Sequence, residues 1–173
     1  MEYDRTDEIT TKQDWLALSK YDYFFAEKTY FSFTYGAKQE KFAGLNLRQF
    51  VGPGIGHQFY EGKPTDLLTE LGIFALDEDF VEQSDNSYWG PAWKLKFEHE
   101  LIDGKLTFYH NHYAVLSAED TDKYLWHSWT GLRFPIVDKL VGSLEYEVDY
   151  DSHPALDAEK SDTTVRLKIG YEW

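Results

Sequence analysis

Two histidines, His110 and His112, stand two residues apart, so a β-strand would place both imidazole rings on one face. Two imidazoles at this spacing could supply half of a zinc site. Spacing fixes no third ligand, although His127 or Glu98 could approach from adjacent strands. We favour the interpretation that both rings are polar aromatic groups near a membrane boundary, and we predict no metal site and no other cofactor.

Serine and histidine also occur side by side, as His127 and Ser128, which suggests a serine nucleophile with a histidine base. Adjacent residues on a strand point to opposite faces, so these two side chains cannot pair directly. His112 could reach Ser128 from the neighbouring strand, which keeps a lipid-modifying hydrolase as an alternative. We predict a protein that has no catalytic residues and is not an enzyme.

Three glycines, Gly52, Gly54 and Gly56, invite comparison with phosphate-binding loops. Their spacing fits neither the dinucleotide fingerprint nor the P-loop, and no helix is predicted after them. Glycines at every second position share one face of a strand, where they make room for a bulky neighbour or a sharp bend. Pro53 lies among them and cannot donate to a β-ladder, so we expect a bulge or a bend there.

Strands must position all these candidates, because apolar and polar residues alternate along the chain and helical periodicity is nearly absent. In the last segment, for example, Val165 and Leu167 alternate with Arg166 and Lys168. We predict nine strands over residues 12–25, 28–38, 45–60, 66–77, 89–102, 105–117, 123–136, 139–150 and 162–173. They exceed the usual strand of ~5–6 residues and reach the ~9–11 residues that cross an outer membrane.

The predicted connections alternate in kind. Short turns such as Asp103-Gly104 and Val137-Asp138 alternate with longer, often acidic segments around 39–44, 78–88, 118–122 and 151–161. Short turns at one end and longer loops at the other are typical of a transmembrane barrel. The predicted fold is therefore all-β, an antiparallel up-and-down transmembrane β-barrel in a single domain over residues 1–173.

Composition narrows the function classes. The 173 residues carry 17 Lys and Arg against 31 Asp and Glu, a net charge of −14, which argues against nucleic-acid binding because phosphate contacts need a basic surface. There is no Cys, so disulfides, thiolate metal sites and cysteine nucleophiles are excluded. Six Trp and 13 Tyr suit a boundary that is apolar on one side and wet on the other, as at a membrane interface.

The two chain ends give further expectations. Met1-Glu2-Tyr3-Asp4 is acidic and does not open a signal peptide, so an outer-membrane location implies a leader that this chain does not include. Nine strands would start the first one at the long-loop end, whereas bacterial single-chain barrels have an even number of strands. We therefore expect that one or more N-terminal strands are missing and that the full barrel has about 10–12 strands.

Each predicted strand has one apolar face and one charged face. If the apolar faces point outward, charges of both signs line the interior. These predicted lumen-facing residues are Arg48, Glu70, Lys94, Lys96, Glu98, Glu100, Arg133, Glu145, Glu147, Asp149, Arg166, Lys168 and Glu172. A soluble sheet with a solvated charged face has the same pattern, but it would need a second layer over its apolar face, and no helix is predicted to supply one.

Several short segments carry a family resemblance. They are Lys41–Leu45, Gly52–Gln58, Thr130–Pro135, Tyr146–Ser152 and Lys168–Trp173. In this order they resemble the YdiY-like family of salt-induced outer-membrane proteins, a bacterial family of unknown function, from about residue 12 to the end. The resemblance implies a Gram-negative outer-membrane barrel with a cleaved leader and additional N-terminal strands. It implies no catalytic residues, and the salt-induced label implies a stress setting.

We therefore predict an outer-membrane barrel that is structural or weakly channel-forming. Its expected partners are outer-membrane lipid, lipopolysaccharide whose divalent cations the acidic loops could share, and the barrel-assembly machinery, which would read the terminal strand that ends at Trp173. Nucleic acid is not an expected partner. Besides the lipid-modifying hydrolase, a soluble β-protein that binds an apolar ligand remains an alternative, and its faces would be inverted.

Overall fold

The computed structural model describes residues 14–40, 44–156 and 158–171. These residues form nine strands and confirm the predicted all-β class. The strands are β1 Asp14–Ala26, β2 Thr29–Glu40, β3 Leu45–Tyr60, β4 Thr65–Phe80, β5 Asn86–Ile102, β6 Leu106–Leu116, β7 Tyr124–Val137, β8 Leu140–Asp151 and β9 Ser161–Tyr171. Among the described residues, no helix is long and apolar enough to cross a membrane.

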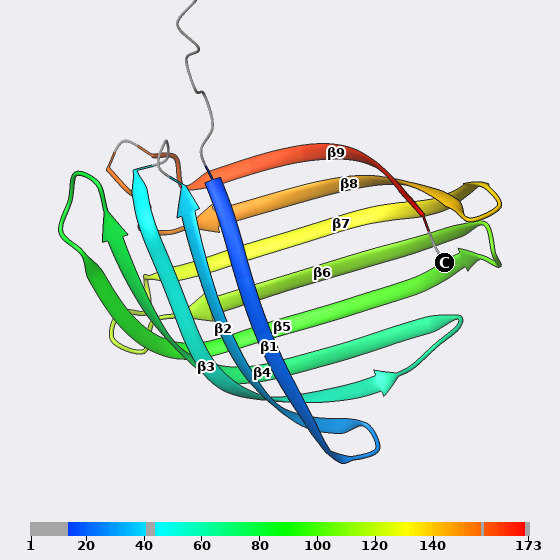
Figure 1. Ribbon diagram of the computed structural model, residues 1–173, viewed down its shortest axis with the longest axis horizontal. Coiled ribbons are helices and arrows are strands. Elements are labelled where there is room, and N and C mark those ends of the chain that lie inside the picture. Colours follow the sequence, from blue (N-terminus) through cyan, green and yellow to red (C-terminus); the bar gives the residue numbers. More distant parts are fainter. Residues whose placement is uncertain (1–13, 41–43, 157, 172–173) are drawn as a thin grey trace, which may run out of the picture.

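Every strand pairs antiparallel with its neighbour in sequence, so the sheet order is β1-β2-β3-β4-β5-β6-β7-β8-β9. The turns after β1, β3, β5 and β7 gather at one end, which we call the turn end (Figure 1). Gly62, Gly104 and Asp138 take positive φ there, as tight turns require. The longer connections lie at the other end, which we call the loop end.

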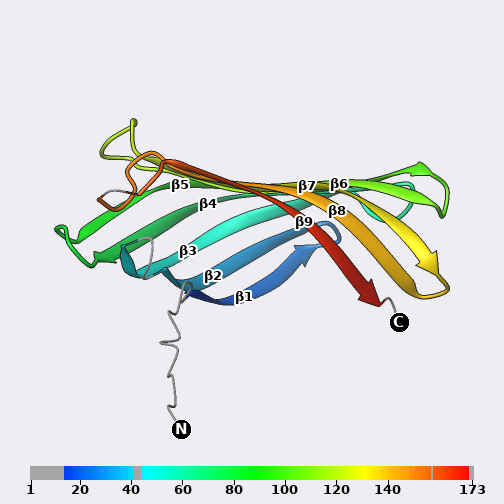
Figure 2. The same ribbon diagram turned by 90° about the horizontal axis from the view of Figure 1, so that it is seen from above.

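The sheet is open where a closed barrel was predicted. Among the described strands, β1 and β9 are the two edges and do not pair with each other. Both run from the loop end to the turn end, so direct pairing between them would be parallel in a sheet that is otherwise antiparallel. Figure 2 shows the resulting shape, a curled sheet with one concave and one convex face.

The sheet packs closely against the glycines of β3. A Cβ on Gly56 would lie 2.1 Å from the Tyr30 ring, and one on Gly52 would lie 2.2 Å from the Ile73 carbonyl oxygen. The glycines therefore make room for neighbouring groups, which is the role that their spacing on one strand face predicted. The bulge expected at Pro53 is absent, because the register with β4 is the same at Val51 and at Gly54. The ladder passes Pro53 without shifting.

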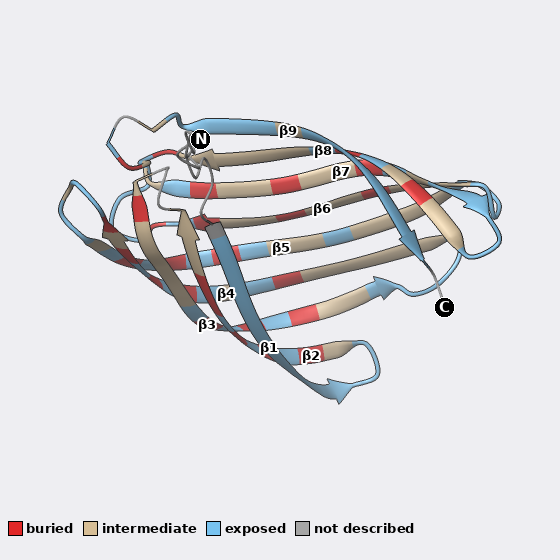
Figure 3. Cartoon of the chain, turned by 45° about the horizontal axis from the view of Figure 1, so that its top comes forward, coloured by how far each residue is buried: buried red, intermediate tan, exposed pale blue. Residues whose placement is uncertain are grey.

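The two faces differ in composition. Buried and exposed residues alternate along much of β2, β3 and β4 (Figure 3). The buried set shares its face with Arg48, whose side chain reaches across the concave space to Asp151 on β8. A small apolar core lies on the concave face near the loop end, formed by Phe74, Leu76, Tyr88, Ala92, Val115 and Leu125. A second cluster joins Leu45 and Phe80 to Ala155 in the β8–β9 loop.

Candidate functional site on the concave face

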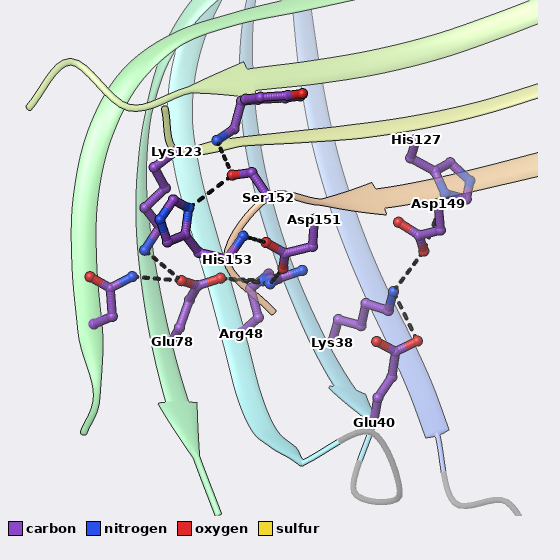
Figure 4. Close-up of polar contacts among 12 residues, drawn as sticks. Lys38, Glu40, Arg48, Glu78, Lys123, His127, Asp149, Asp151, Ser152 and His153 are labelled. Atoms are coloured by element: carbon purple, nitrogen blue, oxygen red, sulfur yellow. Dashed lines mark hydrogen bonds and ion pairs between the residues drawn. The ribbon is translucent and has the colours of Figure 1, made fainter. Parts of the chain in front are cut away.

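The concave face carries a network of paired charges, and its densest part lies at the loop end. We call Lys38, Arg48, Glu78, Lys123, Asp149 and Asp151 the loop-end cluster (Figure 4). Arg48 Nη2 lies 2.7 Å from Glu78 Oε1 and 2.5 Å from Asp151 Oδ2. Lys38 Nζ lies 3.3 Å from Asp149 Oδ2. These contacts join β2 and β3 to β8, with five and four strands respectively lying between them in the sheet order.

Glu78 anchors this cluster. Its side chain is 1% exposed, and its two oxygens accept hydrogen bonds from Arg48 Nε at 2.7 Å, Asn86 Nδ2 at 2.8 Å and Lys123 Nζ at 3.2 Å. A buried carboxylate is tolerated only when paired charges and hydrogen bonds replace the water that it loses. Glu78 meets this condition because the ends of three segments, β3, β5 and the β6–β7 loop, converge on it.

A second buried carboxylate, Glu70, lies in the middle of the concave face. Its side chain is 2% exposed, and Lys20 Nζ lies 2.7 Å and Lys94 Nζ 3.3 Å from its oxygens. The Tyr30 hydroxyl donates to Glu70 Oε2 at 3.1 Å. Strands β1, β2, β4 and β5 are thereby tied together through one group.

The turn end of the concave face is looser. Arg133 Nη1 lies 3.3 Å from Glu98 Oε2, and Lys63 Nζ lies 2.5 Å from Glu100 Oε1. Lys96 is 3.8 Å from Glu98 on its own strand. All of these groups except Lys96 line a pocket of about 290 Å³, together with the apolar Phe134, Pro135 and Val141.

Strands β8 and β9 place their charges opposite each other, although the ion pairs are diagonal. Glu145 and Arg166 are register partners. Glu145 nevertheless pairs with Lys168 at 2.5 Å, and Arg166 Nε lies 2.7 Å from Glu147 Oε2. Diagonal contacts of this kind are within reach of long side chains in an antiparallel pair.

Twelve of the thirteen residues predicted to face the lumen are described, and each lies on the same face as the networks above. The thirteenth, Glu172, lies outside the described residues. Sequence reasoning missed Lys38, Glu78, Lys123 and Asp151 as members of the cluster, and it assigned Asp151 to the acidic loop over 151–161 although β8 extends to that residue. Glu78 was assigned to an acidic loop over 78–88, but β4 continues to Phe80 because it pairs with the start of β3. The alternation of Glu70, Phe74 and Leu76 along the inner face points to Glu78 two residues later.

Two of the histidine candidates, His110 and His112, lie on the convex face, whereas His127 lies on the concave face beside Glu147 and Asp149. Thr130 Oγ1 is 2.7 Å from His110 Nδ1, and His110 Nε2 is 3.0 Å from His112 Nδ1. The ring of His112 stacks on Trp126 at 4.5 Å and meets Trp93 edge-on at 4.3 Å. These contacts form a chain of neutral hydrogen-bonding groups, which we call the histidine chain, under two indole rings.

The hydrogen bonds around His112 and Ser128 bear on whether these two residues form a serine–histidine pair. His112 and Ser128 are register partners, but Ser128 Oγ accepts a hydrogen bond from Trp126 Nε1 at 3.1 Å. His112 Nε2 is buried and has no hydrogen-bond partner among the described residues. Within the described part of the chain, no group of three histidine or acidic side chains is arranged to hold a metal ion. The arrangement therefore offers Ser128 no bonded base.

Comparison with known proteins gives a family but no characterised relative. No curated protein and no solved structure matches the chain. A family model described as "Protein of unknown function, DUF481" matches residues 1–173.

Proposed function

The chain belongs to the DUF481 family of proteins of unknown function, and we propose that it forms the wall of a β-barrel in a bacterial outer membrane. In this proposal the convex face contacts lipid and the concave face lines a charged lumen. The role is structural or weakly channel-forming, without catalysis. The observation that carries the proposal is an exposed apolar band that crosses the convex face at an angle to the strands.

Cross-strand partners define the angle of this band. One line perpendicular to the strands passes through His57, Thr69, Leu95, His112, Ser128, Val148 and Thr163. On β3 the exposed apolar residues Val51 and Ile55 lie on the loop side of this line and Phe59 lies on its turn side. On β9 they lie wholly on its turn side, from Val165 to Tyr171. The band therefore moves toward the turn end as the sheet proceeds.

A band oblique to the strands is what a tilted barrel needs. Strands of outer-membrane barrels tilt by roughly 35–45°, so a layer of lipid parallel to the membrane plane meets successive strands at shifted positions. Leu167 is 75% exposed within this band. Apolar side chains so exposed in water would favour aggregation, whereas lipid is a favourable surrounding for them. The shift across the sheet thus supports a membrane-spanning orientation.

The remaining parts of the proposal follow from the sequence. The segments that resemble YdiY-like salt-induced outer-membrane proteins include Thr130–Pro135 in β7 and Tyr146–Ser152 at the end of β8, and they support membership of that group. A stress-related role, contact with lipopolysaccharide and recognition of the last strand by the assembly machinery belong to the same proposal. Acidic residues in the loops could share divalent cations with lipopolysaccharide.

Labels on the two faces test the membrane orientation. The chain has no cysteine, so Leu144→Cys and Ser143→Cys place single labels on opposite faces of β8. We reconstitute each spin-labelled variant in phosphatidylethanolamine and phosphatidylglycerol vesicles and measure collisions with oxygen and with a water-soluble nickel chelate. We expect the Leu144→Cys label to collide mainly with oxygen and the Ser143→Cys label mainly with the chelate. Equal access of the chelate to both labels, together with solubility without detergent, would favour a soluble β-protein.

A further inference from the structure

The two ends of the concave space differ in the contacts that cross it. At the loop end, Lys38–Asp149 and Arg48–Asp151 pairs cross from β2 and β3 to β8. In the same region Ala155 packs against Leu45 and Phe80. At the turn end, the ion pair between Arg133 and Glu98 joins strands with only β6 between them, and a pocket lies beside it. The concave space is thus bridged at one end and accessible at the other.

The bridge of ion pairs at the loop end has two halves, and the side chains in these two halves differ in how far they are buried. The half on β3, β4 and the β6–β7 loop is anchored by Glu78, which is nearly inaccessible. The half on β8 consists of Asp149, which is 40% exposed, and Asp151, which is 17% exposed. Ion pairs cost more to break as their partners become more buried. Both aspartates are more exposed than Glu78, so the contact between β8 and the cations of β2 and β3 separates more easily than the contacts of Glu78.

We propose that the contact of Asp149 and Asp151 with Lys38 and Arg48 is an autoinhibitory latch, which closes the loop end of the lumen to ions. This proposal rests on the membrane-spanning barrel of the preceding section. Glu78 and Lys123 hold the fixed side of the latch in place. When the aspartates separate from the cations, the bridge at the loop end opens, and the charged side chains of the concave face can line a path for ions from the turn-end pocket.

The experiment compares potassium release from vesicles that contain the wild-type chain or the double variant Asp149→Asn with Asp151→Asn. The matched control is Glu82→Gln with Asp85→Asn, which removes the same charge from the exposed β4–β5 loop at the same end. Among the described residues, neither Glu82 nor Asp85 takes part in the ion pairs of the loop-end cluster. We expect the latch variant to release potassium about tenfold faster than the wild type and the control, since conduction depends on the charges that line a path. Equal release from all three proteins would overturn the latch.

A crosslink keeps the proposal testable if the asparagine variant folds poorly. Lys38→Cys with Asp149→Cys can be joined by a short bismaleimide, because the chain contains no other cysteine. We expect the uncrosslinked protein to leak and the crosslinked one to return to the wild-type rate. Equal leakage in both states would contradict the latch. Membrane insertion is scored separately by the β8 labels, so a protein that does not insert refutes the barrel, whereas an inserted protein with unchanged release refutes only the latch.

Discussion

The loop-end cluster and the histidine chain solve the same problem, a polar group removed from water, in opposite ways. On the concave face, Arg48 and Glu78 keep full charges and pair with each other. On the convex face, Thr130, His110 and His112 form a chain of groups that can all be neutral. Ion pairs suit a lumen that water can reach in part, while neutral hydrogen bonds suit a face against hydrocarbon. This difference supports the proposed orientation, in which the concave face meets water and the convex face meets lipid.

The largest expected effect comes from breaking the buried part of the ionic network. Arg48→Leu leaves Glu78, which is 1% exposed, with a charge that Lys123 and Asn86 compensate only in part. We expect the folded state to lose about 3–5 kcal/mol, as for other buried pairs with one partner removed. Urea unfolding in detergent, read by the mobility of unboiled samples, measures the loss. The double variant Arg48→Leu with Glu78→Leu is the control and should recover much of it, and no recovery would contradict a charge-based explanation.

A charge placed in the histidine chain tests the opposite face. His112→Lys would put an ammonium in the middle of the apolar band, and we expect a loss of about 2–4 kcal/mol, as for lysine facing lipid near the bilayer midplane. His127→Lys is the matched control, because His127 lies within 3.5 Å of both Glu147 and Asp149 on the concave face. Urea unfolding in lipid vesicles compares the two. Equal losses would mean that the convex face does not meet lipid.

A smaller effect is expected when one neutral bond of the chain is removed. Thr130→Val deletes the hydroxyl that lies 2.7 Å from His110 Nδ1 and changes the volume little. Leaving that nitrogen without a partner should cost about 1–2 kcal/mol. Thr163→Val, on the convex face of the edge strand β9, is the control and should change the unfolding midpoint little. A midpoint for Thr130→Val that matches the control would show that the hydrogen bond contributes nothing.

The smallest effect concerns the partly exposed pair at the sheet edge. Arg166 is half-exposed and pairs with the more buried Glu147, so Arg166→Leu should cost about 1 kcal/mol, between the values for surface and buried pairs. Arg5→Leu, in the N-terminal segment outside the described residues, is the comparison, and we expect it to cost less. Urea midpoints from unboiled samples decide between them. Equal midpoints would indicate a wide, water-filled lumen that screens these charges.

Local patterns were enough to predict the strands and their faces. Alternation placed β3 at residues 45–60, the bounds that the structure gives, and separated Val165 from Arg166. These features depend on neighbours in sequence, which the chain itself specifies. The alternation was less clear in β1, because the apolar Leu16 and Leu18 share a face with the charged Lys20.

Contacts between distant strands could not be predicted in the same way. Lys38 and Asp149 are 111 residues apart, and no local pattern relates them. Their contact depends on how tightly the sheet curls, which is set by close approaches such as Gly52 against the Ile73 carbonyl. No local pattern relates β1 to β9 either, which are the two edges of the described sheet. Position on a face was therefore predictable, whereas the partner across the concave space was not.

The neighbour-by-neighbour order of the strands has a consequence for folding kinetics. Each hairpin closes a short segment of chain, so the sheet can grow one strand at a time with little entropic cost at each step. The contacts from β2 and β3 to β8 span more than 100 residues and can form only after the strands between them are in place. Interactions made after the transition state slow unfolding and leave the folding rate nearly unchanged. The long-range ion pairs thus set how long the assembled sheet lasts, while the hairpins set how fast it forms.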